Sequence, residues 1–172
     1  MQKKEELSKL IKEVLRARDS RSPRTPLLVK ISPDLSREDR EDIATVVLNT
    51  DTRVDGLIVT NTTITRPELK SEYRNETGGL SGAPLRELST ETIHDIYKLT
   101  GGHIPIIGVG GVSSGEDAYK KICAGASLVQ LYSALIFQGP PVVTRIRREL
   151  NEILEKEGFD NISQAVGSAH RK

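Results

Sequence analysis

The sequence predicts an α/β fold built on parallel strands, and three observations predict it. Four short apolar runs, typical of buried strands, alternate with segments whose apolar residues have helical spacing. Gly, Pro and small polar residues separate these segments. Polar residues or paired glycines stand at the carboxyl end of each apolar run. Because all four runs are apolar, we expect helices to cover both faces of the sheet.

Length and composition exclude several classes of protein. The chain has 172 residues, enough for one domain with a core, and a net charge of +1, which favours neither a nucleic-acid partner nor an anionic membrane. Aromatic residues make up 3%, too few for a platform that stacks nucleic-acid bases. The single cysteine, Cys123, excludes an internal disulfide and is expected to be a buried core residue. No apolar run approaches the ~20 residues of a membrane span, so we expect this chain alone to be soluble.

The first third of the chain predicts a helix, a strand and a second helix. Apolar residues at helical spacing over 3–18 predict an amphipathic helix, and the turn-rich segment 19–26 connects it to an apolar strand at 27–31. Ser36, with Asp39 three residues later, resembles a capping box and predicts a helix that starts at residue 37.

The middle of the chain predicts a strand, a long irregular section and a helix. The strand covers 56–63 and ends in polar residues, and the irregular section runs from 64 to 88. A loop of that length in a compact domain is usually functional or disordered, and the glycines and apolar residues of ETGGLSGAPLREL argue against disorder. We expect Ser89 to cap the following helix, which the glycines at 101–102 end.

The last third predicts two more strands and two more helices. The strand IPIIGV at 104–109 leads through Gly110 and Gly111 into the helix EDAYKKICAG, and the strand SLVQLYS covers 127–133. Prolines open a final helix, VVTRIRRELNEILEKEG, and the residues after it are expected to form a tail.

The stretch IPIIGVGGVSSG predicts a phosphate site. A strand that ends in Gly110 and Gly111 and leads into a helix N-terminus lets backbone N–H groups approach an anion, and the helix dipole favours negative charge. The fingerprint of a dinucleotide site does not fit, because Ser113 stands where G-x-G-x-x-G requires its last glycine.

The polar groups at the strand ends predict a ligand site at the carboxyl edge of the sheet. We expect Lys30 to be a partner for an anion or carbonyl, Asn61 with its flanking threonines to contact substrate, and Ser133 with local amides beside Tyr132 to hold phosphate. Both doubly wound sheets and (β/α)8 barrels bind ligands at this edge, and the missing dinucleotide fingerprint favours the barrel. Since a whole barrel needs eight strands in ~250 residues, the simplest account is the C-terminal half of a (β/α)8 TIM barrel, about strands 5–8, with residues 1–172 as a single partial domain.

The three histidines show no partner at catalytic or metal-ligand spacing. His94 falls on a predicted helix, His103 in a turn and His170 in the tail. We expect all three to be structural or solvated, and we expect no metal site.

Five segments resemble one enzyme family. VKISPDL, DGLIVTNTT, ETGGLSGAPLREL, PIIGVGGVSSG and GASLVQLYSALIFQGPP closely resemble class 2 dihydroorotate dehydrogenases, the quinone-linked, FMN-containing enzymes of pyrimidine synthesis. The match runs from the first helix to the tail, and the ending GSAHRK is similar to animal mitochondrial members. The resemblance implies oxidation of dihydroorotate to orotate, with FMN as cofactor and ubiquinone as the oxidant of the reduced flavin.

The resemblance also implies roles for particular residues. Lys30 matches the lysine beside the flavin pyrimidine ring, and Asn61 and Thr62 match residues that bind dihydroorotate or orotate. The remaining matches are to FMN contacts, on the flavin or its phosphate: Thr60, Gly82, Gly110, Gly111, Tyr132 and Ser133. Ser133 stands where the family more often has Thr, and it keeps the hydroxyl group.

The resemblance implies that the catalytic base lies outside this chain. In the family it is a serine on the loop after strand 4, and Ser8, Ser20 and Ser22 do not fit that motif. The quinone site and the segment that anchors the full-length protein to the mitochondrial inner membrane would likewise precede the chain. Two alternatives stay open: a non-catalytic half-barrel that self-associates, and another barrel that binds FMN or a sugar phosphate.

Overall fold

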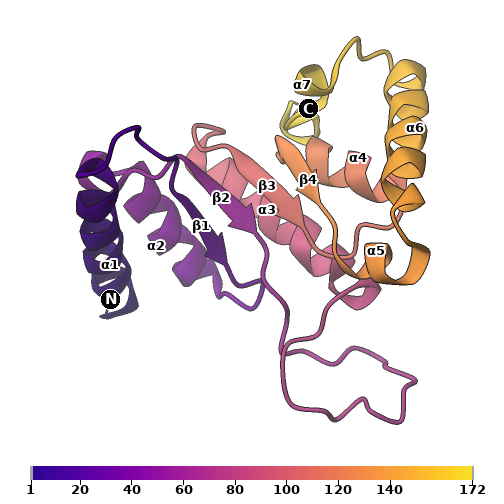
Figure 1. Ribbon diagram of the computed structural model, residues 1–172, viewed down its shortest axis with the longest axis horizontal. Coiled ribbons are helices and arrows are strands. Elements are labelled where there is room, and N and C mark those ends of the chain that lie inside the picture. The colour runs from indigo at the N-terminus through magenta and orange to yellow at the C-terminus, as the bar shows by residue number, and fades with distance from the viewer. Residues whose placement is uncertain (1, 172) are drawn as a thin grey trace.

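The computed structural model describes residues 2–171, in which four strands form one parallel sheet (Figure 1). The strands are β1 (Leu28–Ile31), β2 (Gly56–Val59), β3 (Ile106–Val109) and β4 (Leu128–Gln130), and neighbouring strands are consecutive in the chain. Lys30 pairs with Ile58, Ile58 with Ile107, and Ile107 with Leu128. Since all four strands run the same way, their carboxyl ends share one edge of the sheet. The α/β fold with a parallel sheet is therefore confirmed.

Seven α-helices accompany the sheet in the described part of the chain. They are α1 (Gln2–Asp19), α2 (Arg37–Leu48), α3 (Arg86–Thr100), α4 (Gly115–Cys123), α5 (Ser133–Gln138), α6 (Pro141–Lys156) and α7 (Ile162–Ala165). Short 3-10 helices are η1 (Thr50–Thr52), η2 (Ala83–Leu85) and η3 (Ser168–His170). Among residues 2–171, no helix combines the length and the apolar character that crossing a membrane requires.

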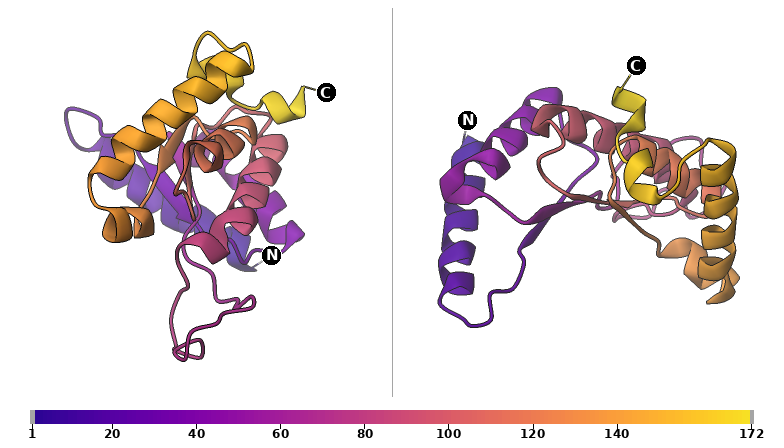
Figure 2. Two further views of the ribbon diagram at one scale, coloured as in Figure 1. Left: turned by 90° about the vertical axis from the view of Figure 1, so that its right-hand side faces the viewer. Right: turned by 90° about the horizontal axis from the view of Figure 1, so that it is seen from above.

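The helices cover only one face of the sheet, which corrects the expectation of two covered faces. Leu57 and Val59 point to the covered face and are fully buried in a core shared with α1, α2 and α3. Alternate residues point to the other face, where Leu128 is 61% exposed and Leu28 36%. Figure 2 shows the helices arranged around one side of the sheet with the opposite side open. The apolar open face explains why the strands appear buried on both sides when only their sequence is considered.

Local chemistry explains where α2 and α3 begin and end. The Ser36 hydroxyl accepts a hydrogen bond from the Asp39 N–H at 3.1 Å, and the Asp39 carboxylate accepts one from the Ser36 N–H, so the predicted capping box is confirmed. Gly101 ends α3 in the left-handed conformation, with φ of 60°. The predicted cap at Ser89 is wrong, because η2, which contains Pro84, starts the helical turn earlier and α3 begins at Arg86.

Other parts of the chain also differ from the sequence-based expectations. The strand predicted at 56–63 stops at Val59. The strand predicted at 127–133 stops at Gln130, and Ser133 begins α5 instead. The predicted tail contains α7 and η3, and it is tied to α4 by a hydrogen bond from the Gly167 N–H to the Ile122 carbonyl at 3.0 Å. Cys123, at the end of α4, is half-buried rather than buried.

A long loop leaves the carboxyl edge of the sheet after β2 and projects away from the molecule (Figure 1). Its two ends meet in an isolated antiparallel bridge between Thr63 and Leu80. The prediction of an irregular section is confirmed from residue 64 to η2, and the chain re-enters regular structure there rather than at residue 89.

Candidate functional site

A cavity of about 400 Å³ lies at the carboxyl edge of the sheet. All the residues predicted from the sequence to bind a ligand line it: Lys30, Thr60, Asn61, Thr62, Gly82, Gly110, Gly111, Tyr132 and Ser133. These residues follow or end all four strands, or belong to the loop after β2. The structure therefore brings together, in one cavity, groups as far apart in the chain as Lys30 and Ser133.

The ends of β1, β2 and β3 are fixed to one another beneath this cavity. The Asn61 N–H donates to the Ile31 carbonyl at 2.7 Å, and the Thr60 N–H donates to the Val109 carbonyl at 2.9 Å. Thr60 is 2% exposed, whereas Asn61 is exposed at the cavity. Rigid backbone support of this kind leaves the Asn61 amide free to recognise a ligand.

Lys30 brings an uncompensated positive charge to the cavity. It lies on the open face of β1, in register with Ile58, and its side chain is exposed. Within residues 2–171, its ammonium group makes no hydrogen bond or ion pair with a side chain or carbonyl. An ammonium without a carboxylate partner is available to stabilise negative charge on a ligand.

The turn after β3 requires glycine at both positions. Gly110 and Gly111 have φ values of 132° and 68°, which strain residues with side chains. A Cβ on Gly111 would lie 2.6 Å from the Arg86 Cβ and 2.8 Å from its Cα, and one on Gly110 would lie 2.8 Å from the Ser89 Cβ. The start of α3 therefore packs directly against the backbone of this turn.

The turn itself, more than the following helix, offers donors for an anion. At the start of α4 the Gly115 N–H donates to Glu149 Oε2 at 2.7 Å, and the Ser113 N–H donates to Asp117 Oδ2 at 2.9 Å, so these donors are occupied. Within the described residues, the N–H groups of Gly111 and Val112 donate to no protein acceptor. Free backbone N–H groups beside two glycines suit the oxygens of a phosphate.

Arg86 and Asp117 brace the turn from outside the cavity. Arg86 Nε donates to the Gly111 carbonyl at 2.9 Å and lies 2.9 Å from Asp117 Oδ1, while Arg86 Nη2 donates to the Ser113 hydroxyl at 3.1 Å. Burial opposes ionisation of Asp117, but hydrogen bonds from Ser113 and Ser114, together with the Arg86 charge, hold its pKa below the usual value. The charged pair thus fixes the shape of the glycine turn.

Behind the same turn, Lys121 is completely buried. Its Nζ donates to the Arg86 carbonyl at 3.2 Å, to the Ser89 hydroxyl at 3.0 Å and to the Thr90 hydroxyl at 2.9 Å. The Ser89 hydroxyl in turn donates to the Val109 carbonyl at 2.6 Å. All three N–H donors of the ammonium are therefore satisfied, and they join α4 to the first turn of α3 and the end of β3.

The far side of the cavity is formed where β4 leads into α5. A Cβ on Gly82 would lie 3.5 Å from the Ser133 Cβ and hydroxyl, so the loop after β2 and the start of α5 meet there. Tyr132 is 69% exposed and Phe137 is 86% exposed. This side combines a hydroxyl group with open apolar surface.

Sequence reasoning missed several residues that line the cavity. The polar ones are Ser81, Ser113, Gln130 and Gln138, and the apolar ones include Leu131, Ala134 and Phe137. Gln130 had a usable signal, since it is a polar residue at the end of an apolar strand. Gln138 and Phe137 had none, because their position depends on α5, a helix that was not predicted between the strand at 127–133 and the prolines at 140–141.

The histidines lie away from the cavity. The His94 and His170 rings stack at 4.1 Å, and His170 Nε2 is 3.0 Å from the Ala124 carbonyl. His103 is exposed. Among residues 2–171, no three His, Cys, Asp or Glu side chains gather as they would around a metal ion.

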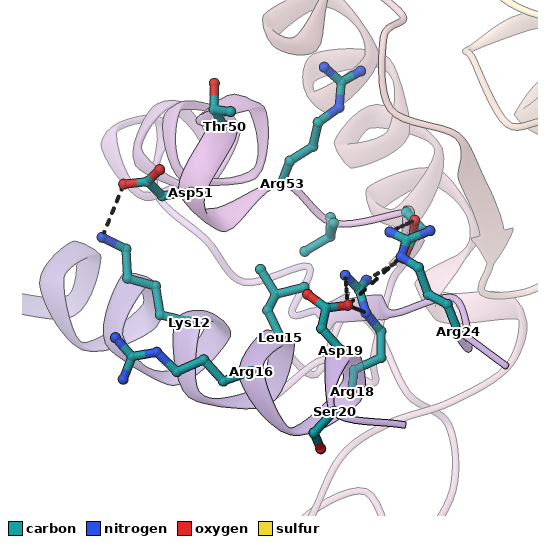
Figure 3. Close-up of a pocket in the computed structure, with 12 residues that line it drawn as sticks. Lys12, Leu15, Arg16, Arg18, Asp19, Ser20, Arg24, Thr50, Asp51 and Arg53 are labelled. Atoms are coloured by element: carbon teal, nitrogen blue, oxygen red, sulfur yellow. Dashed lines mark hydrogen bonds and ion pairs between the residues drawn. The ribbon is translucent and has the colours of Figure 1, made fainter. Parts of the chain in front are cut away.

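A second hollow, of about 930 Å³, lies at the opposite edge of the sheet (Figure 3). Its charges are largely paired: Arg18 and Arg24 both bind the Asp55 carboxylate at 2.8 Å. Arg16 and Arg53 have no carboxylate partner within the described chain, but their side chains point away from one another. Without convergent groups this hollow is a weaker candidate than the cavity at the carboxyl edge.

Comparison with known proteins gives consistent matches. The family model described as dihydroorotate dehydrogenase matches residues 1–154. A mitochondrial dihydroorotate dehydrogenase (quinone) from Mus musculus is 57% identical over 175 residues, which cover 100% of this chain and 44% of that protein. A dihydroorotate dehydrogenase (quinone) from Parvibaculum lavamentivorans is 54% identical over 98% of this chain and 47% of its own length.

Solved structures show the same fold. The crystal structure of a ligand-free enzyme of this type from Eimeria tenella superimposes with a TM-score of 0.83 and 52% sequence identity, over 87% of this chain and 41% of that chain. The chain thus spans less than half the length of the relatives that it matches.

Proposed function

The chain belongs to the dihydroorotate dehydrogenase family, and we propose that it forms the C-terminal half, about strands 5–8, of a (β/α)8 barrel that oxidises dihydroorotate to orotate with FMN and a quinone. The observation that carries this proposal is the cavity at the carboxyl edge, which gathers the ends of all four strands. In such barrels that edge holds the active site. We infer the quinone linkage from the Mus musculus and Parvibaculum lavamentivorans relatives, and the mitochondrial location from the Mus musculus relative.

The residues of the cavity fit FMN. The free N–H groups of Gly111 and Val112, with the Ser133 hydroxyl on the facing side, would hold the phosphate. The absence of side chains at Gly110 and Gly111 lets backbone approach it, and Gly82 and Thr60 would contact the flavin. When bound, FMN would supply a two-electron acceptor for the hydride that leaves the substrate.

Lys30 and the segment after β2 would provide electrostatics and orientation. The unpaired Lys30 ammonium would stabilise negative charge on the reduced flavin. The Asn61 amide, exposed at the cavity, and the half-buried Thr62 hydroxyl would hydrogen-bond the dihydroorotate ring. These groups bind and orient, and none of them is placed as a base; we propose that the base is a serine on a loop after strand 4, outside this sequence.

Flavin and substrate binding test the proposal together. Full-length protein that contains this sequence should retain FMN, and orotate should shift the flavin absorption spectrum. Dihydroorotate should bleach the flavin under anaerobic conditions, and Lys30→Ala should slow that bleaching by at least about 100-fold because a charge that stabilises the transition state is lost. FMN binding without any response to orotate would favour another FMN or sugar-phosphate barrel.

The place of the base can be tested separately. The purified 172-residue chain, loaded with FMN, should form no orotate from dihydroorotate, since it holds the contacts but not the base. Appreciable turnover by this chain would contradict the assignment of the base to another segment.

A further inference from the structure

The loop between Thr63 and Leu80 begins and ends at the cavity. Asn61 and Thr62 line the cavity just before the loop, and Ser81 and Gly82 line it just after. At its base the Thr63 N–H donates to the Leu80 carbonyl at 3.1 Å, and the Leu80 N–H donates to the Thr63 carbonyl at 2.7 Å. The geometry of this base therefore sets the position of the neighbouring residues Asn61 and Thr62, which we propose to bind substrate.

Arg66 holds the two arms of the loop together. Its guanidinium donates to the carbonyls of Thr63 and Thr65 on the outgoing arm, at 3.4 and 3.1 Å. It also donates to the carbonyls of Glu76 and Gly78 on the returning arm, at 3.0 and 2.6 Å. The planar fork of arginine can span both arms, whereas the compact ammonium of lysine cannot bond to all four carbonyls at once.

Asp34 anchors the same base to the segment that follows β1. Its Oδ2 accepts a hydrogen bond from the Ile64 N–H at 2.8 Å, and its Oδ1 accepts one from the Thr63 hydroxyl at 2.5 Å. Thr63 is fully buried, and its hydroxyl also accepts a hydrogen bond from the Thr65 N–H at 3.0 Å. The segment after the strand that carries Lys30 is thereby joined to the base of the loop, directly after Asn61 and Thr62.

The returning arm also packs on a predicted substrate contact. A Cβ on Gly79 would lie 1.9 Å from Thr62 Oγ1 and 2.5 Å from Thr62 Cβ. The backbone at Gly79 is therefore in direct contact with the Thr62 side chain. Any shift of the returning arm displaces Thr62, and displacements of about 1 Å can reduce catalysis roughly 100-fold.

We propose that Arg66 and Asp34 are positioning residues that clamp the base of this loop and hold Asn61 and Thr62 in the geometry that binds dihydroorotate. The inference rests on the proposed function. It assigns neither residue to the reacting atoms, because both bond to the backbone and to Thr63 rather than to groups in the cavity. Their loss should therefore weaken substrate binding while the phosphate turn, on the other side of the cavity, still holds flavin.

The test uses full-length protein with Arg66→Ala, Arg66→Lys, Asp34→Ala and Asp34→Asn. Arg74→Ala is the matched control, because Arg74 is an exposed arginine on the same loop whose side chain makes no hydrogen bond or ion pair within residues 2–171. Flavin content, KM and kcat for dihydroorotate, and the orotate-induced spectral shift are measured for each variant.

We expect Arg66→Ala and Asp34→Ala to raise KM and the orotate Kd by roughly 10-fold or more, because several hydrogen bonds at the base of the loop are lost. Flavin content should stay within about twofold of the unaltered protein, and Arg66→Lys should fail to rescue because lysine lacks the fork. Asp34→Asn should have an intermediate effect, because its amide oxygen can still accept one of the two hydrogen bonds.

Two results would overturn the inference. One is that the Arg66 and Asp34 variants behave like Arg74→Ala; the other is that they lose flavin in proportion to the rise in KM, which indicates a merely structural role. If the unaltered protein neither retains FMN nor responds to orotate, the proposed function fails as well, and that failure is visible before any variant is made. If the alanine variants do not fold, Arg66→Lys and Asp34→Asn provide the test. The inference then requires that they raise KM while flavin content stays within about twofold of the unaltered protein.

Discussion

The turn that we propose to bind the FMN phosphate tolerates only glycine at position 111. Gly111→Ala should abolish FMN retention and lower the free energy of unfolding by about 1–3 kcal/mol, because its positive φ is strained for alanine and its Cβ would overlap the Arg86 backbone. Gly158→Ala is the matched control, since Gly158 has a φ of 78° but nothing within 4 Å of an added Cβ. Urea unfolding and flavin absorbance measure the two effects. An equal loss of unfolding free energy in both variants would show that backbone strain alone, and not overlap with Arg86, destabilises Gly111→Ala.

Because Lys121 is buried, we expect the free energy of unfolding to vary with pH in the alkaline range. Burial lowers its pKa from the usual 10.5 to about 8, against the opposing effect of Glu87 and Asp117. Between these two pH values the unfolded chain holds a proton that the folded chain has released. Stability due to this group therefore rises with pH across that window and is lower below pH 8, where the buried amine is charged.

Replacement of Lys121 by Met tests this linkage. The free energy of unfolding of the unaltered chain should gain about 2 kcal/mol between pH about 7.5 and about 9.5 relative to Lys121→Met, which lacks the titrating group. Urea unfolding of both proteins at pH about 7.5 and about 9.5 measures the difference, and other titrating groups cancel because they are common to both. Parallel stability changes in the two proteins would contradict the assignment.

The residues of the candidate site that could be predicted from the sequence have positions defined by local sequence, whereas those that could not have positions defined by contacts between distant segments. Lys30, Asn61 and Gly111 were predictable because each stands at or directly after the end of an apolar strand, and parallel strands end at one edge. Arg86 and Asp117 were not, because their function depends on a contact between segments 31 residues apart and on the exact start of α3. Asp34 and Arg66 had no signal either, since one follows a strand among other polar residues and the other lies in a loop without periodicity.

At the scale of elements, local sequence signals predicted the start of α2 correctly but gave no indication of α5. The Ser36 capping box lies within four residues, so local sequence defines it. The six residues of α5, SALIFQ, are nearly as apolar as a strand, and all six are at least 38% exposed or lie at the cavity, so periodicity carries no information. The tail was missed for a similar reason: α7 has only four residues and depends on tertiary contact with α4.

The capping box of α2 gives a prediction confined to this element. Ser36→Ala should lower the free energy of unfolding by about 1 kcal/mol, because the Asp39 N–H loses its acceptor and water replaces it only in part. The orotate-induced spectral shift should be unchanged, since Ser36 does not line the cavity. Thr45→Ala, at an exposed position of the same helix, is the control for the loss of a hydroxyl group bonded to the backbone, because Thr45 Oγ1 donates to the Glu41 carbonyl at 2.8 Å. A loss of stability no greater than that control would show that the box contributes nothing.

At the scale of the whole molecule, the fold leaves an apolar surface open. The uncovered face of the sheet carries Leu28 and Leu128 on its two edge strands, and α5, which follows β4, adds Ile136 at 67% and Phe137 at 86% exposure. Edge strands with unpaired backbone groups and contiguous exposed apolar side chains favour association with another sheet. In a complete barrel both edges would be paired, which is consistent with relatives that are more than twice as long as this chain.

The 172-residue chain, purified by itself, should therefore associate through this surface. Light scattering should show a mass that rises with protein concentration, because each buried apolar side chain contributes roughly 1–2 kcal/mol to the contact. The double variant Ile136→Ser/Phe137→Ser should raise the dissociation constant by at least about 10-fold. Tyr73→Ser is the control, since Tyr73 is 67% exposed but lies on the projecting loop rather than on the open face. A folded monomer at every concentration would mean that the open face needs no partner, and it would also remove the support for a self-associating half-barrel.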